Sequence, residues 1–217
     1  MAYLVTISQD ERFYLNNAHP IRTLFCDVGG VLIENPWALT AKELSSEHTV
    51  NGAKAYAELV RLSRALDSNQ LSLPELWKEF SDTLGIRIPY AHFRRLFLDD
   101  SFVKIPPVWD AVRSLRQSVG FRVFALSNMS QPAWRSLQRK YDIRSLFDGA
   151  TLSYKFGILK PDRRIFKIAL ENAHRSSSES IFIDDLEPNV DTAASLGFRV
   201  HLVRSPTGTA KFLASLN

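Results

Sequence analysis

The sequence contains a single cysteine, Cys26, and it lacks long apolar segments and dense clusters of basic residues. One cysteine excludes an internal disulfide and is typical of a reducing compartment. No apolar run approaches the roughly 20 residues that are needed to cross a bilayer. The chain carries 27 Lys and Arg against 23 Asp and Glu. No element carries a clustered run of Lys and Arg with interleaved aromatic residues, which argues against nucleic-acid binding.

The first residues, 1–7, also lack the basic start and the long apolar body of a secretory signal. These absences predict a cytoplasmic protein that binds neither a membrane nor nucleic acid. With 217 residues, 45% of them hydrophobic and 23% charged, the chain has the size of a compact core with one insertion. Cys26 lies within an apolar run, which favours a small buried side chain over a reactive thiol. Nothing in the pattern specifies an oligomeric state.

Three short apolar runs share one pattern, because each ends in polar residues. These are residues 24–26 before Asp27, residues 121–126 before Ser127 and Asn128, and residues 181–183 before Asp184 and Asp185. Such runs are typical of buried parallel strands. Ligands bind beyond the carboxyl ends of these strands in open α/β sheets. The polar endings are therefore candidate site residues.

From residue 105 onward, helical and strand patterns alternate along the chain. We expect helices at residues 108–118, 132–140, 163–171 and 190–196, and strands at residues 121–126, 150–152, 181–183 and 199–203. Gly197 stands where a helix stop is expected. This alternation predicts an α/β fold with a Rossmann-like, doubly wound parallel sheet and helices on both faces.

Residues 38–100 show a different pattern, with apolar residues at three- and four-residue spacing. Ser72 is a plausible cap for a helix that begins near Pro74. We expect Tyr56 and Trp77 to be core residues rather than substrate contacts. The predicted organisation is a small all-helical cap at 38–100, inserted into a core of residues 21–37 and 101–217. Residues 1–20 form an N-terminal extension.

Asp27, Ser127, Lys160 and Asp185, in that order and setting, resemble the four motifs of the haloacid dehalogenase-like (HAD) hydrolase superfamily. The resemblance extends over about residues 21–202. It is specific because four separated motifs agree in order and in strand or loop setting. It is greatest to phosphatase branches that carry a helical cap between the first and second motifs.

The resemblance implies a Mg²⁺-dependent phosphatase that hydrolyses a small phosphorylated metabolite, such as a sugar phosphate, through an aspartyl-phosphate intermediate. Asp27 matches the nucleophile of the family, and Lys160 matches the lysine that keeps such a carboxylate ionised. Ser127, Asn128 and Lys160 are the expected phosphate ligands. The alternatives are a helix-capping role for Ser127 and Asn128 and a solvated loop position for Lys160.

The metal is expected to bind through oxygen ligands, as hard Mg²⁺ requires. By resemblance, these are the carboxylates of Asp27 and Asp185 and the backbone carbonyl of Gly29. Asp184 and Asn189 stand at the edge of that site as direct or water-mediated ligands. The alternative for the acidic pair is a favourable charge at a helix N-terminus.

The sequence departs from the family at Gly29, where phosphatases usually have a second Asp that serves as general acid and base. General acid–base catalysis contributes about 10²–10⁴-fold, so the loss leaves three readings open. They are a phosphatase with another proton donor, a HAD hydrolase of different chemistry (phosphonate cleavage or dehalogenation), and a non-catalytic protein that binds a phospholigand or a partner.

Several side chains are candidates for the missing acid or for substrate contacts. They are Glu34, Asn35 and Trp37 after the first motif, and His48 and His92 in the predicted cap. A linker role for the first three, and a surface or core role for the histidines, are the alternatives. Gly29→Asp would restore a carboxyl group, provided that the loop does not need a positive φ at this position.

Overall fold

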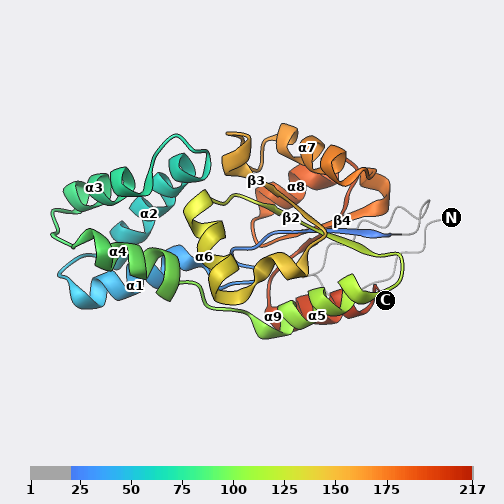
Figure 1. Cartoon of the computed structure of the whole chain (residues 1–217), viewed down its shortest axis with the longest axis horizontal. Coiled ribbons are helices and arrows are strands. Elements are labelled where there is room, and N and C mark those ends of the chain that lie inside the picture. Colours follow the sequence, from blue (N-terminus) through green and yellow to red (C-terminus); the bar gives the residue numbers. More distant parts are fainter. Residues whose placement is uncertain (1–20, 217) are drawn as a thin grey trace.

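The structure, a computed structural model, describes residues 21–216 and contains one five-stranded parallel sheet (Figure 1). The strands lie in the order β3-β2-β1-β4-β5. They are β1 Thr23–Cys26, β2 Arg122–Ser127, β3 Gly149–Leu152, β4 Ser180–Asp184 and β5 Arg199–Leu202. Every pairing is parallel. The predicted α/β fold is confirmed, with strand bounds within two residues of those expected.

Helices cover both faces of the sheet, with α5 and α9 on one side and α7 and α8 on the other (Figure 1). Their bounds are α5 Pro106–Gln117, α6 Gln131–Tyr141, α7 Arg163–Ala173, α8 Glu187–Ser195 and α9 Pro206–Ala214. Gly197, at φ +90°, follows the end of α8 as expected. The sequence pattern did not predict α9. Among the described residues, no helix is long and apolar enough to cross a membrane.

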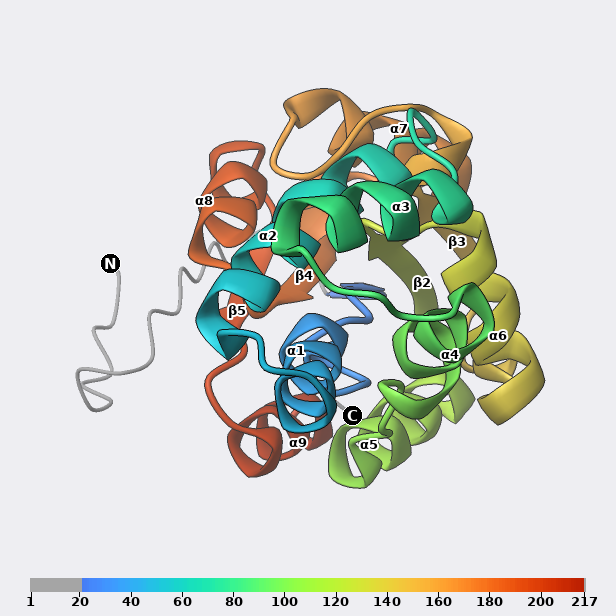
Figure 2. The same ribbon diagram turned by 90° about the vertical axis from the view of Figure 1, so that its left-hand side faces the viewer.

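The segment between β1 and β2 forms a helical insertion (residues 36–100) at one end of the sheet (Figures 1 and 2). It consists of α1 Pro36–Glu47, α2 Gly52–Asp67, α3 Leu73–Leu84, α4 Tyr90–Arg95 and the π-helical turn η1 Leu96–Asp100. Ser72 caps α3 in a reciprocal pair with Glu75, as predicted. Tyr56 is 38% exposed, so its expected core position was wrong. Its place on α2 leaves the ring on the surface.

The apolar core follows the alternation of side chains along the strands. Phe25 and Phe182 pack with the residues of α7 and α8 on one face. Leu24 and Cys26 belong to the larger cluster on the other face, which continues into the helical insertion. The division into a core and a separate cap stays a prediction, and the N-terminal extension (1–20) lies outside the described residues.

One titratable side chain is packed into the layer between β5 and α9. His201 stacks on Phe212 with ring centroids 4.1 Å apart, and its Nε2 lies 3.1 Å from Thr209 Oγ1. Burial lowers the pKa of His201 to about 4. The folded protein therefore holds this imidazole neutral at pH values where the unfolded chain is protonated.

We predict that this histidine destabilises the fold in acid. Because the pKa of His201 is lower in the folded state, its contribution to the free energy of unfolding is complete above pH 6.5. That contribution is lost as the pH falls toward 4. The loss is on the order of 2–3 kcal/mol. His201→Phe should flatten the fall in Tm between pH 6.5 and 4, whereas His48→Gln should not. Parallel Tm curves for the parent and His201→Phe would contradict the assignment.

Candidate active site

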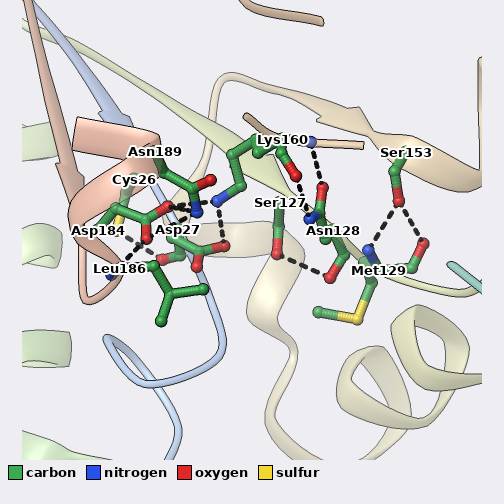
Figure 3. A network of polar contacts seen from close by, with 10 residues as sticks. All are labelled: Cys26, Asp27, Ser127, Asn128, Met129, Ser153, Lys160, Asp184, Leu186 and Asn189. Atoms are coloured by element: carbon green, nitrogen blue, oxygen red, sulfur yellow. Dashed lines mark hydrogen bonds and ion pairs between the residues drawn. The ribbon is translucent and has the colours of Figure 1, made fainter. Parts of the chain in front are cut away.

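The polar endings of three strands come together (Figure 3) at the end of the sheet that faces the helical insertion (Figure 1). Asp27 follows β1, Asp184 ends β4 and Ser127 ends β2. The chain runs from β1 to β2 and β3 on one side, and β4 then lies on the other side of β1. Asp27 and Asp184 therefore flank the topological switch point, where α/β sheets bind ligands.

Lys160 is buried between the two carboxylates at this point. Its Nζ lies 2.9 Å from Asp27 Oδ1 and 2.5 Å from Asp184 Oδ2. Asn128 holds the backbone of Lys160 from both sides, because its Oδ1 accepts from the Lys160 N–H (2.7 Å) and its Nδ2 donates to the Lys160 carbonyl (3.1 Å). With 2% of its surface exposed, Lys160 is not a solvated loop lysine. The Asn128 side chain positions this lysine.

Asp184 is fully buried, and the protein itself occupies both of its carboxylate oxygens. Asn189 Nδ2 donates to Oδ1 and Oδ2 at 3.0 Å, and the backbone N–H of Leu186 donates to Oδ1 at 2.8 Å. With Lys160 on Oδ2, Asp184 acts mainly as the counter-ion of that lysine. Asn189 positions Asp184 rather than standing free at the edge of the site.

Three carboxylates nevertheless crowd one small volume. Oxygens of Asp27, Asp184 and Asp185 all lie within 4.8 Å of one another. Burial raises the pKa of Asp27 to about 7, with a further rise from the neighbouring carboxylates and an opposing effect of Lys160. Burial and the charge of Asp184 raise the pKa of Asp185 to about 6. The single Lys160 charge does not balance three carboxylates.

One oxygen of this cluster has no aligned hydrogen-bond donor. Asp27 Oδ1 is buried, and Lys160 Nζ pairs with it by charge but off the hydrogen-bond direction. A second cation would satisfy this oxygen and the excess negative charge. The site therefore fits a divalent metal with oxygen ligands.

The glycine pair after β1 serves two different purposes. Gly30 has φ +74°, and a Cβ at this position would stand 2.2 Å from Asp185 Oδ2. Gly29 lies outside the left-handed region, and no atom lies within 4 Å of the place where its Cβ would be. Gly30 therefore lets the Asp185 carboxylate approach the loop, whereas Gly29 leaves room for a side chain.

We predict that Gly30→Ala lowers the stability and Gly29→Ala does not. The left-handed backbone costs alanine roughly 1–2 kcal/mol, and the displaced Asp185 carboxylate adds to this. Each kcal/mol corresponds to about 2–4 °C in Tm at this chain length. Thermal unfolding of the two variants side by side tests the difference. Equal melting of both would show that the loop rearranges freely.

The helical insertion contributes a carboxyl group that the sequence pattern did not single out. Asp67, the last residue of α2, is 6% exposed, and its backbone carbonyl accepts a 2.6 Å hydrogen bond from Ser153 Oγ. Burial, with a further rise from the charge of Asp27, raises the pKa of Asp67 to about 8. The sequence carried no local signal for it beyond an acidic residue at a helix end.

Three of the earlier candidates for an acid or a substrate contact have other partners. Asn35 caps α1 by accepting from the N–H groups of Trp37 and Ala38. Trp37 stacks on Phe97 with ring centroids 4.9 Å apart. His92 pairs with Glu47 on the surface of the helical insertion. Asn35 and Trp37 thus serve the linker, as the alternative reading expected.

Comparison with known proteins identifies the family. The haloacid dehalogenase-like hydrolase family matches residues 21–197. The chain belongs to this family. Over 207 residues it is 28% identical to acyl-CoA dehydrogenase family member 10 of Mus musculus. The aligned region covers 90% of this chain but only 19% of that relative. The chain thus spans about a fifth of the length of that relative.

Two further relatives of this HAD-like hydrolase are similar over most of their length. A sesquiterpene phosphatase of Aspergillus oryzae is 28% identical over 189 residues, covering 82% of this chain and 88% of the relative. A HAD family enzyme of Bacteroides thetaiotaomicron, crystallised with magnesium and inorganic phosphate, superposes with a TM-score of 0.68 at 22% identity. That match covers 85% of this chain and 94% of the other, and it shows a shared fold.

Proposed function

We propose that this HAD-like hydrolase is a Mg²⁺-dependent phosphatase that acts on a small phosphorylated metabolite. The observation that carries the proposal is the buried Asp27 carboxylate, held against Lys160 at the switch point beside two further carboxylates. The sesquiterpene phosphatase and the phosphate-bound Bacteroides enzyme support the same reading. Dehalogenation would use the nucleophile without needing the acidic cluster, so the cluster favours phosphoryl transfer.

In the proposed reaction, Asp27 attacks phosphorus and becomes the aspartyl phosphate, which water then hydrolyses. Lys160 favours the ionised form of Asp27 and attracts the phosphate oxygens. Ser127 and the backbone of Asn128 lie at the end of β2, beside Asp27, as the remaining phosphate contacts. Asn128 has a second duty, because its side chain fixes the Lys160 backbone.

For the metal, we assign Asp27, Asp185 and the Gly29 carbonyl as ligands. Asp184 stands behind them as the partner of Lys160, because its oxygens are already engaged. When bound, Mg²⁺ would neutralise charge on the cluster and on the transferring phosphoryl group. The crowding of three carboxylates around a single ammonium group is the observation that supports a cation here.

One prediction of the proposed function concerns the nucleophile. Asp27→Asn should lower the turnover of p-nitrophenyl phosphate at least ~10³-fold, because an amide cannot form the covalent intermediate. Circular dichroism and Tm should stay close to those of the parent. The control is Asp191→Asn on the exposed side of α8, which should leave turnover unchanged. A folded Asp27→Asn that keeps more than a few per cent of turnover would refute the nucleophilic role.

Another prediction of the proposed function concerns the metal. Asp185→Asn should weaken Mg²⁺ binding in calorimetric titration by at least ~10-fold, because a charged oxygen ligand is lost. Without Mg²⁺, the variant should be at least as stable as the parent, because repulsion between Asp185 and Asp184 is relieved. Asp191→Asn is again the matched control. Equal Mg²⁺ affinity in parent and Asp185→Asn would contradict the assignment.

A further inference from the structure

The replacement of the family acid by Gly29 leaves the proposed phosphatase without a proton donor on the loop after β1. A donor must be protonated at neutral pH, shielded from bulk water and near the leaving oxygen of a substrate bound at the nucleophile. Among the described carboxyl groups outside the acidic cluster, Asp67 of the helical insertion is buried and is close enough to Asp27 to be affected by its charge. It comes from a segment that lies 40 residues after the nucleophile in the sequence.

The side chain of Ser153, the residue that follows β3, links the end of α2 to the loop that follows β2. Ser153 Oγ donates to the Asp67 carbonyl (2.6 Å) and accepts from the Met129 N–H (2.9 Å). The Asp67 carboxyl group faces the backbone N–H of Ser130, the residue that caps α6. Asp67 is thus fixed beside the segment 127–130 that carries the proposed phosphate contacts.

The surroundings of Asp67 favour the neutral acid. Its carboxyl group is buried, and the strongest charge acting on it from the core is the like charge of Asp27. Arg64 on its own helix and the Ser130 N–H act in the opposite direction, and the balance raises the pKa to about 8. A carboxyl group that senses the Asp27 charge and remains protonated at pH 7 can donate a proton as the Asp27–phosphorus bond forms.

We propose that Asp67 supplies the general acid and base that Gly29 lacks, an inference that rests on the phosphatase function proposed above. In the first step, an Asp27 oxygen bonds to phosphorus, the bond from phosphorus to the leaving oxygen breaks, and the Asp67 proton passes to that oxygen. In the second step, the oxygen of a water molecule bonds to phosphorus, its proton passes to the Asp67 carboxylate, and the bond between phosphorus and the Asp27 oxygen breaks. Phosphate is released, Asp27 returns to the carboxylate, and Asp67 returns to the neutral acid.

The experiment compares phenyl phosphate with p-nitrophenyl phosphate, two substrates of similar shape. The phenolate ion of the first is the poorer leaving group, so its hydrolysis depends more on a proton donor. Asp67→Asn should lower kcat/KM about 10²-fold for phenyl phosphate and less than ~10-fold for p-nitrophenyl phosphate. For phenyl phosphate, the alkaline fall of the parent's pH profile should also disappear. Asp67→Glu should retain most of the activity.

Two further variants separate proton transfer from docking of the helical insertion. Asp99 of η1 also bridges the insertion and the core, because it accepts a 2.6 Å hydrogen bond from Ser136 Oγ of α6. Asp99→Asn should affect both substrates equally and weakly. Gly29→Asp has room for its side chain, and in the Asp67→Asn background it should restore phenyl phosphate hydrolysis preferentially.

The outcomes distinguish the two proposals. If the parent hydrolyses both esters and Asp67→Asn does so at the same rates, Asp67 is not the donor, whereas the phosphatase function stands. An equal loss on both substrates in a folded Asp67→Asn, unrescued by Gly29→Asp, would assign Asp67 to positioning and overturn its acid role. A parent that hydrolyses neither ester would overturn the proposed function and this inference with it.

Discussion

The arrangement of the site depends on one buried lysine. Lys160 lies between Asp27 and Asp184, with Nζ within 2.9 Å of an oxygen of each. A buried ammonium ion is costly unless it is paired, and removing either partner of a buried pair leaves an uncompensated charge. The neighbouring amides serve this pairing, because Asn128 fixes the Lys160 backbone and Asn189 fixes Asp184. The ends of β1, β2 and β4 are thereby tied to one loop.

The charge of this lysine is smaller than the charge that surrounds it. Three carboxylates meet one ammonium group. Burial and this excess of negative charge together raise the pKa values of Asp27 and Asp185. An excess of negative charge is poorly suited to receiving a phosphate anion and well suited to binding a cation first. The same electrostatic field reaches Asp67 in the helical insertion and favours its neutral form. Burial is the larger cause of that neutral form, so it does not depend on this field alone.

The position of a site residue could be predicted from the sequence wherever the residues next to it in the chain determine that position. Asp27, Ser127 and Asp184 follow apolar runs directly, so the parallel sheet and the meeting of its strand ends could be predicted. The roles of Asn128 and Asn189 could not be predicted. Asn128 bonds the distant Lys160, and Asn189 reaches back from α8 to Asp184 at the end of β4. The separate duties of Gly29 and Gly30 depend on φ and on the approach of Asp185. Asp67 was missed because its position beside residues 127–130 depends on the docking of α2 through Ser153.

An acid at position 67 would affect control of the reaction differently from an acid at position 29. An acid on the loop after β1 is in place whenever the core is folded. An acid at the end of α2 is in place only while the helical insertion rests on the loop at 127–130, a contact made through Ser153 and Ser130. Proton donation would then be coupled to docking of the helical insertion on this loop. The insertion would thereby take part in the chemistry itself.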